Sequence, residues 1–234
     1  YENGQLESRE NYKEGKVNGL YETYYENGQL ESRENYKNGK RHGLWETFFS
    51  NNNPFILHGQ LQERKNYKNG EQDGPHENFR TNGKLKQKVN FKNGKWDGFR
   101  EWFYKNDQLR NRGNYKNGKQ EGLHETFYEN GQLKIRGNLK NNKLDGLWEW
   151  FYKNDQLKQK GNYNNGKRDG HWEFFHENGQ LKTRGNYKNG LQQGPWEWFH
   201  KNGQLKYREN YYKNDELVGF VETSYVYDCD DIPF

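Results

Sequence analysis

The sequence predicts an all-β protein, a single-layer, twisted antiparallel meander of about nine tandem β-hairpins of about 24 residues each. Three observations lead to this prediction. A leucine recurs at a fixed period, turn-forming dipeptides recur with it, and aliphatic residues are scarce. Hydrophobic residues make up 29% of the 234 residues, and aromatic residues alone account for 17%. Such a chain must be held together by hydrogen-bonded ladders and aromatic contacts, and its aromatic content argues against disorder.

The repeat is defined by this leucine, which occupies positions 6, 30, 61, 85, 109, 133, 157, 181 and 205. The spacing is 24 residues except for the step from Leu30 to Leu61, which places seven extra residues in the stretch 50–58. The repeat array is therefore expected to span residues 1–224, with an insertion at 50–58 and an acidic tail at 225–234.

Each repeat is expected to be a strand, a turn, a second strand and a second turn, as in the strands 133–139 and 147–152. Asn-Gly or Asn-Asp follows most repeats, for example at 27–28 and 154–155, and predicts a two-residue type I′ turn between hairpins. Inside each repeat, a stretch such as 117–122 has a glycine near each end and predicts a longer loop.

The two-residue turn fixes the strand register. It places Tyr25 opposite Leu30 and Glu22 opposite Arg33. The same arithmetic predicts the structural ion pairs Glu101–Arg112, Glu125–Arg136, Glu149–Lys160, Glu173–Arg184 and Glu197–Arg208. No pair is predicted for Glu46 and Arg64, because the insertion lies between them.

This register also places tryptophans opposite glycines. Trp148 falls opposite Gly161 and Trp172 opposite Gly185, an arrangement that covers exposed backbone, whereas Trp196 falls opposite Glu209. Strand alternation then predicts two different faces. One face is expected to carry Trp148, Trp150, Tyr152, Leu157 and Tyr163, and the other Leu147, Glu149, Phe151, Lys160 and Asn162.

The repeated units resemble a known repeat family. Residues 165–187, NGKRDGHWEFFHENGQLKTRGNY, are similar to the variant form of the membrane occupation and recognition nexus (MORN) repeat, in particular to bacterial proteins labelled YwqK-type antitoxins. The resemblance extends to about Thr223 and leaves out the insertion and the tail. It implies an array of β-hairpins that binds proteins or, in some members, acidic phospholipids.

For the repeated Glu, for the histidines and for Cys229, the sequence favours a structural role over a catalytic or metal-binding one. The repeated Glu has a basic residue predicted opposite it, and no nucleophile motif accompanies it. His176 and His200 lie on strands about 9–10 Å apart, too far to share a metal ion. Cys229 and its neighbouring aspartates lack the spacing of a calcium or zinc site. We therefore expect no enzymatic activity, catalytic residue, cofactor or metal.

Charge favours an acidic partner or surface for most of the chain. Residues 215–234 contain six acidic residues and no Lys or Arg, which leaves residues 1–214 with 38 basic and 27 acidic residues, a net charge of +11. The leading expectation is a scaffold for a protein partner such as a toxin or effector. The alternatives are a membrane adaptor for acidic phospholipids and a binder of single-stranded nucleic acid, the latter less favoured.

Partner binding is expected to use the aromatic side chains, because tryptophan and tyrosine are enriched in interface hot spots. The candidate residues are Trp102, Tyr104, Tyr128, Trp148, Trp150, Tyr152, Trp172, Trp196 and Trp198, with Phe55, Ile56 and Leu57 of the insertion. That insertion either folds back onto the sheet or anchors a partner. No apolar run is long enough to span a membrane as a helix. The sequence starts within a repeat at Tyr1, so a preceding signal peptide or further repeats, the compartment and the oligomeric state stay open.

Overall fold

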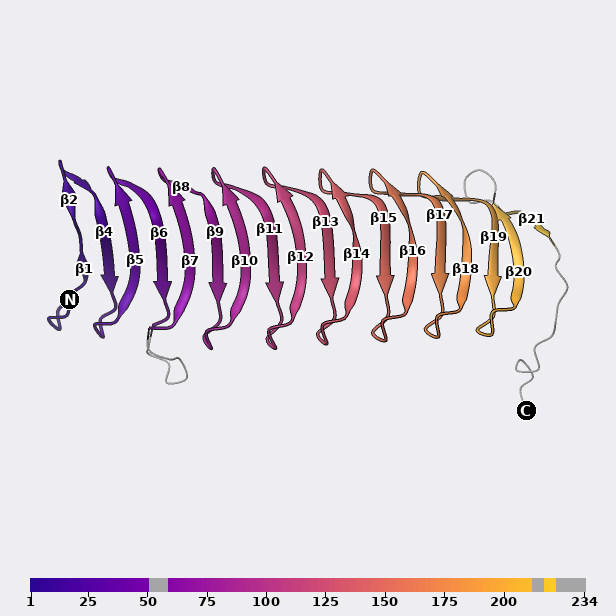
Figure 1. The fold of residues 1–234 in the computed structure, drawn as a ribbon, viewed down its shortest axis with the longest axis horizontal. Coiled ribbons are helices and arrows are strands. Elements are labelled where there is room, and N and C mark those ends of the chain that lie inside the picture. The colour runs from indigo at the N-terminus through magenta and orange to yellow at the C-terminus, as the bar shows by residue number, and fades with distance from the viewer. Residues whose placement is uncertain (51–58, 212–216, 222–234) are drawn as a thin grey trace. The chain divides into compact units, whose positions relative to one another are not determined.

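In the computed structural model, residues 1–50, 59–211 and 217–221 are described. All regular elements among them are β-strands, and they group into two compact units, Tyr1–Gln120 and Glu121–Phe234. Within each unit, hairpins follow one another in sequence order and every paired strand is antiparallel (Figure 1). The predicted all-β meander of 24-residue hairpins is therefore confirmed.

The strands of the N-terminal unit are β1 (Ser8–Arg9), β2 (Tyr12–Lys13), β3 (Lys16–Val17), β4 (Gly19–Tyr24), β5 (Leu30–Lys37), β6 (Lys40–Phe48), β7 (Leu61–Lys68), β8 (Glu71–Gln72), β9 (Gly74–Phe79), β10 (Leu85–Lys92), β11 (Lys95–Phe103) and β12 (Leu109–Lys116). Those of the C-terminal unit are β13 (Lys119–Phe127, which begins just before the boundary), β14 (Leu133–Lys140), β15 (Lys143–Phe151), β16 (Leu157–Asn164), β17 (Lys167–Phe175), β18 (Leu181–Lys188), β19 (Leu191–Phe199), β20 (Leu205–Tyr211) and β21 (Leu217–Val221).

The two kinds of turn are the reverse of the prediction. Inside a repeat, Asn38 and Gly39 both have positive φ, 52° and 75°, and Lys37 pairs with Lys40, so this is the two-residue type I′ turn. Between repeats, the loop has three residues. Tyr25 N–H donates to Gln29 O at 2.8 Å, and the Tyr25 carbonyl accepts from Gly28 N–H at 2.8 Å.

This three-residue loop needs only one residue in the left-handed region, so Gly28 has φ of 78°. Asp155 replaces that glycine in a later repeat, with φ of 67°. Tyr25 therefore does not pair with Leu30 as predicted. A bulge follows, in which Thr23 pairs with Ser32 and Tyr24 with Leu30. The bulge compensates for the longer loop, so the register beyond it is the predicted one.

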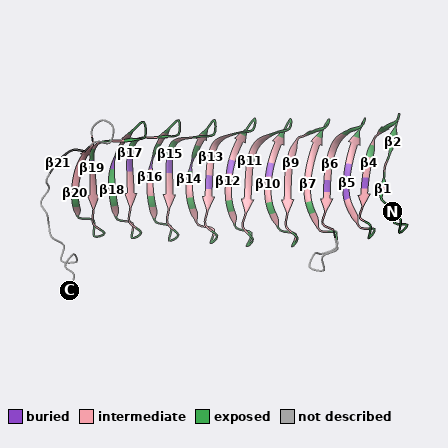
Figure 2. Cartoon of the chain, turned by 180° about the vertical axis from the view of Figure 1, so that it is seen from behind, coloured by how far each residue is buried: buried purple, intermediate pink, exposed green. Residues whose placement is uncertain are grey.

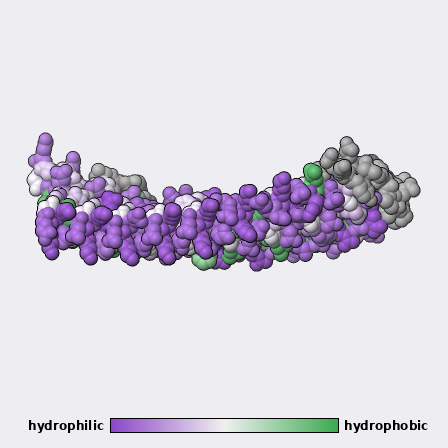
Figure 3. All heavy atoms as spheres, turned by 90° about the horizontal axis from the view of Figure 1, so that it is seen from above, coloured by the Kyte–Doolittle hydropathy of each residue, from purple (hydrophilic) through white to green (hydrophobic). Residues whose placement is uncertain are grey.

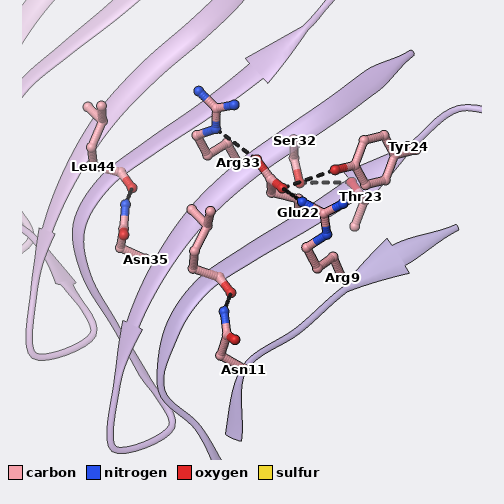
Figure 4. A network of polar contacts seen from close by, with 10 residues as sticks. Arg9, Asn11, Glu22, Thr23, Tyr24, Ser32, Arg33, Asn35 and Leu44 are labelled. Atoms are coloured by element: carbon pink, nitrogen blue, oxygen red, sulfur yellow. Dashed lines mark hydrogen bonds and ion pairs between the residues drawn. The ribbon is translucent and has the colours of Figure 1, made fainter. Parts of the chain in front are cut away.

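A second bulge interrupts each repeat near its type I′ turn. Between the pairs Glu34–Trp45 and Tyr36–Arg41, one strand has two more residues than its partner, and Gly43 there has φ of 98°. The side chain of Asn35 bridges the gap, because its Nδ2 donates to the carbonyl of Leu44 at 3.0 Å (Figure 4). Asn11 and Asn66 make the same bond to the carbonyls of Leu20 and Pro75, so the bulge explains the glycine and asparagine of these repeats.

Buried side chains are few and lie near the middle of the strands (Figure 2). Val89, Trp148, Trp172 and Trp196 are the buried hydrophobic residues among those described. The surface seen along the strands is mainly hydrophilic (Figure 3), in keeping with the scarcity of aliphatic residues. No helix of the described chain could cross a membrane.

Candidate interaction surface

We call the side of the sheet that carries Trp148, Trp150, Trp172, Trp196 and Trp198 the Trp face, and the opposite side, which carries Glu149, the Glu face. The predicted register is observed, since Trp148 pairs with Gly161 and Glu149 with Lys160. One predicted side-chain position is wrong. Leu157 pairs with Phe151, and because cross-strand partners share a face, it belongs to the Glu face. The bulge after Trp150 causes this change.

Three tryptophans form the centre of the C-terminal unit. Trp148, Trp172 and Trp196 are only 3%, 0% and 1% exposed. Each indole lies over a glycine: a Cβ built on Gly161 would come within 2.2 Å of Trp172. Each indole Nε1 also donates to a backbone carbonyl, as Trp172 does to Asn162 O at 3.1 Å.

The covered glycine is not the one that the sequence pattern predicted. Trp148 lies over Gly137, Trp172 over Gly161 and Trp196 over Gly185, in each case on the preceding strand. Trp196 therefore follows the same rule as the other two, although it pairs with Glu209 on the following strand. Burial leaves these three indoles little surface for a partner, so their role in the structure is to cover the sheet.

Trp45 shows what decides the direction of the ring. On the preceding strand, the cross-strand partner of Trp45 is Glu34, where Trp172 has Gly161. Instead of covering that residue, the Trp45 ring lies under the ammonium group of Lys65 on the following strand, 4.3 Å from the ring centroid. A side chain on the preceding strand thus excludes the indole, whereas a glycine leaves room for it.

Half-buried rings alternate with the buried indoles. Trp150 lies between Trp148 and Trp172, with ring centroids 6.0 and 5.8 Å away. Phe174 lies 5.9 Å from Trp172 and stacks on it, and Trp198 stacks on Tyr207 at 4.8 Å. Together these contacts make a continuous ladder of rings along the Trp face, whose half-buried members present aromatic surface to solvent.

Phe174 is a member of this ladder that the sequence analysis missed. It occupies the repeat position of Trp150 and Trp198, so the 24-residue period would have identified it. Tyr163 and Tyr187 support the ladder edge-on, with centroids 5.2 and 5.8 Å from Trp172. Trp150, Phe174 and Trp198 are the half-buried members of the ladder that keep some surface in contact with solvent, and we call these three residues the exposed ladder.

The tyrosines among the candidate residues connect neighbouring repeats. The hydroxyl of Tyr128 donates to Phe151 O at 2.8 Å, and that of Tyr152 donates to Phe175 O at 2.9 Å. His176, one repeat later, places Nε2 3.2 Å from Phe199 O and takes the same position. These hydroxyls are therefore used within the sheet, which weakens the case for Tyr128 and Tyr152 as partner contacts.

Trp102 and Tyr104, in the N-terminal unit, lie beside cationic side chains. The guanidinium of Arg100 lies over Trp102 at 3.9 Å, and Trp102 Nε1 donates to Gln87 Oε1. The guanidinium of Arg110 lies 5.8 Å from the Tyr104 ring. Phe55, Ile56 and Leu57 lie outside the described residues, as does the tail at 225–234.

The Glu face carries a ladder of alternating acidic and basic side chains. The five predicted pairings are observed as cross-strand partners: Glu101–Arg112, Glu125–Arg136, Glu149–Lys160, Glu173–Arg184 and Glu197–Arg208. Glu46 also pairs with Arg64, at 2.9 Å, although the insertion separates them in sequence. The strands on either side of the insertion therefore pair in the same register as in the other repeats.

Arg136, Lys160 and Arg184 also face a second glutamate on the other neighbouring strand, whereas Arg208 pairs with Val221 there. Arg136 contacts Glu149 at 2.7 Å, Lys160 contacts Glu173 at 2.9 Å, and Arg184 contacts Glu197 at 2.6 Å. In the N-terminal unit, Glu22 lies between Arg9 and Arg33, at 3.6 and 3.0 Å (Figure 4). The ion pairs thus run across the strands as a network rather than as isolated pairs.

Two glutamates of this network, Glu22 and Glu197, have a pKa below the ordinary value. Burial raises the pKa of Glu197, but hydrogen bonds from Arg184 and Arg208 outweigh burial, so that the pKa lies below its ordinary value. The same balance, with Arg33 and Tyr24 as donors, lowers the pKa of Glu22. Both carboxylates thus have structural partners that explain their shifts. In the described part of the chain, no group of three or more His, Cys, Asp or Glu residues is placed to hold a metal ion.

A comparison with protein families finds the model for the MORN repeat variant in eight segments, residues 1–14, 17–38, 72–93, 97–117, 120–141, 144–165, 168–189 and 192–214. Together they cover more than half of the chain. The unmatched stretch between 38 and 72 contains the insertion. No curated protein matches the chain significantly.

Proposed function

Because the chain belongs to the MORN repeat variant family, we propose that it is a non-enzymatic scaffold whose exposed ladder binds a protein partner. Repeats of this family suggest binding to proteins or membranes, and the ladder favours a protein. Trp150, Phe174 and Trp198 offer one half-buried ring in each of three successive repeats, and each ring contacts a buried indole. Rigid aromatic side chains bind at low cost in conformational entropy and are frequent hot spots.

The continuous ladder is the observation that carries this proposal. Similar aromatic residues elsewhere have their polar groups engaged, as Tyr128 and Tyr152 do, or lie buried, as Trp172 does. Large rings at this repeat position are not needed to form the strands, since the position holds Thr23 and Thr47 in β4 and β6 of the N-terminal unit. An antitoxin or immunity role, in which the scaffold covers a toxin, is a narrower form of the same proposal that the sequence resemblance suggests.

Affinity purification from the native host tests the proposal. The wild-type chain is compared with a Trp150→Thr, Trp198→Thr variant and with a Leu147→Thr, Leu191→Thr control. Leu147 and Leu191 are exposed hydrophobic residues, 48% and 44% exposed, outside the ladder. The proposal requires a protein that the wild type and the control retain and the tryptophan variant loses. Equal retention by all three chains would contradict it.

A second candidate, binding to acidic phospholipid, is favoured by the type I′ turns of the N-terminal unit. Exposed lysines flank these turns at positions 13, 16, 37, 40, 68, 92, 95, 116 and 119. Adjacent hairpins repeat about every 10 Å, so one edge of the unit presents a regular row of positive charge. Sedimentation with vesicles that contain or lack acidic lipid tests this candidate, and salt-dependent binding to a single-stranded oligonucleotide tests nucleic-acid binding.

A further inference from the structure

The N-terminal unit has a hollow on its Trp face that none of the candidate residues lines. Its volume is about 660 Å³, and its lining comes from β2 to β6 and the residues beside them. Ser32 and Glu34, which are 6% and 7% exposed, are its most buried lining residues. Tyr12, 62% exposed, is on the rim.

The hollow exists because small residues replace the rings of the later repeats. Thr23 and Thr47 occupy the repeat position of Trp150 and Trp198. Thr23 Oγ1 and Ser32 Oγ are 2.8 Å apart and share a hydrogen bond (Figure 4). Where the C-terminal unit has stacked rings, this part of the sheet therefore has an open, polar floor.

The charge of the lining is negative although the chain is basic. Glu10, Glu31 and Glu34 line the hollow together with one cation, Arg41. Arg41 Nε lies 3.0 Å from Glu34 Oε2, so this cation is already paired. Two carboxylates therefore remain in excess, and this excess favours a positively charged ligand over a phosphate or a carboxylate.

Tyrosine rings form the sides of the hollow. Tyr21 and Tyr36 meet edge to face, with centroids 5.9 Å apart and an interplanar angle of 74°. The Tyr36 hydroxyl donates to Glu34 at 2.7 Å, and the Tyr12 hydroxyl donates to Glu10. Aromatic faces beside carboxylates attract ammonium and guanidinium groups, of which guanidinium is the more weakly hydrated. Burial, followed by the charges of Glu10 and Glu34, raises the pKa of Tyr21, in agreement with a negative potential here.

We propose that this hollow binds an organic cation, an ammonium or guanidinium group carried either by a polyamine or by a Lys or Arg side chain of a peptide. Carboxylates on the lining supply the counter-charge and the tyrosine rings supply cation–π contact. The site uses residues of the N-terminal unit only, so it does not depend on the exposed ladder. Failure of either proposal leaves the other intact.

Isothermal titration calorimetry at low ionic strength tests the site with three probes: spermidine, a capped Arg-Lys dipeptide and a capped Glu-Glu dipeptide. The variant Glu10→Gln, Glu31→Gln removes the excess charge and keeps the Glu34–Arg41 pair. Its matched control is Glu71→Gln, Glu177→Gln, at two exposed positions outside the hollow. We expect saturable binding of at least one cationic probe to the wild type and control, at least tenfold weaker in the Glu10, Glu31 variant. The stronger cationic probe identifies the source of the cation.

A second variant tests the shape of the hollow independently of its charge. Thr23→Trp with Thr47→Trp introduces the residue that the array already has at positions 150 and 198, and Thr126→Trp, in the C-terminal unit, is its control. The filled variant should lose binding, and the control should keep it. The proposal is overturned if neither cationic probe binds saturably or if the Glu-Glu dipeptide binds as tightly as the cationic probes. It is also overturned if the Glu10, Glu31 variant binds the cationic probes with unchanged affinity.

Discussion

Replacing Gly161 with alanine should destabilise the C-terminal unit although alanine is the better residue for an ordinary strand. Gly161 is not among the glycines with positive φ, so its backbone suits any residue. Without Trp172, the substitution would stabilise the protein by about 0.4–1 kcal/mol, because alanine restricts the unfolded chain. With Trp172 in place, the new Cβ would lie 2.2 Å from ring atom Cδ2, well inside contact distance.

The Trp172 ring has no free direction in which to move. It is fully buried, its Nε1 is held by Asn162 O at 3.1 Å, and Tyr163 and Tyr187 meet it edge-on. Overpacking of this kind costs about 1–3 kcal/mol. We therefore expect Gly161→Ala to lower the free energy of unfolding by about 1–2 kcal/mol after the gain from the unfolded chain is included.

A double-mutant cycle with Trp172→Ala measures this coupling by denaturant unfolding followed by tryptophan fluorescence and circular dichroism. In the Trp172→Ala background, Gly161→Ala should become neutral or stabilising, so its effect changes sign. A neutral or stabilising Gly161→Ala in the wild-type background would refute the reasoning, because the ring would then not occupy the space above the glycine.

Three further predictions concern the connections between repeats. Tyr152→Phe should lower the free energy of unfolding by about 0.5–1.5 kcal/mol through loss of its hydrogen bond to Phe175 O, measured by denaturant unfolding. Gly203→Asp should be nearly neutral, since Asp155 has the same turn position and φ of 67°, whereas Gly203→Val should clearly lower the thermal midpoint. Because the pKa of Glu197 is depressed in the folded state, its contribution to stability is present above the ordinary value of 4.5 and is lost as pH falls through the folded pKa. Unfolding at a series of pH values should show this loss for the wild type and not for Glu197→Gln.

The period of the sequence was sufficient to predict the fold and most of the register. The register was correct although the turn assignment was wrong, because the three-residue loop at Gly28 and the bulge beside Leu30 shift the strands in opposite directions. The extra loop residue and the bulge each shift the register by one residue, so the two shifts cancel in the pairing of Glu22 with Arg33. They do not cancel at the bulge itself, which is why Tyr25 and Leu157 were misplaced.

Side-chain direction was less predictable than register. Alternation assigns Trp172 to a face, but both neighbouring strands offer a glycine, and the rotamer decides which of them the ring covers. The comparison of Trp172 with Trp45 shows that the cross-strand partner on the preceding strand, glycine or glutamate, determines the direction of the ring. For the same reason, sequence alone could not separate the buried Trp148 from the half-buried Trp150.

The candidate site was predicted in part. Concentration of tryptophan in the C-terminal unit identified the Trp face, and the repeat period contained the signal for Phe174. The hydrogen bonds of Tyr128 and Tyr152 to the next repeat were not predictable, since they depend on how far a side chain reaches along the sheet. The hollow beside Thr23 was missed because it results from the absence of large residues.

The most direct test of the proposed function is the affinity of the purified native partner for the Trp150→Thr, Trp198→Thr variant. Hot-spot residues each cost about 2 kcal/mol or more when truncated, so the double variant should bind at least about 30-fold more weakly while circular dichroism shows an intact sheet. The Leu147→Thr, Leu191→Thr control should bind as the wild type does. A folded tryptophan variant with unchanged partner affinity would contradict the assignment of binding to the exposed ladder.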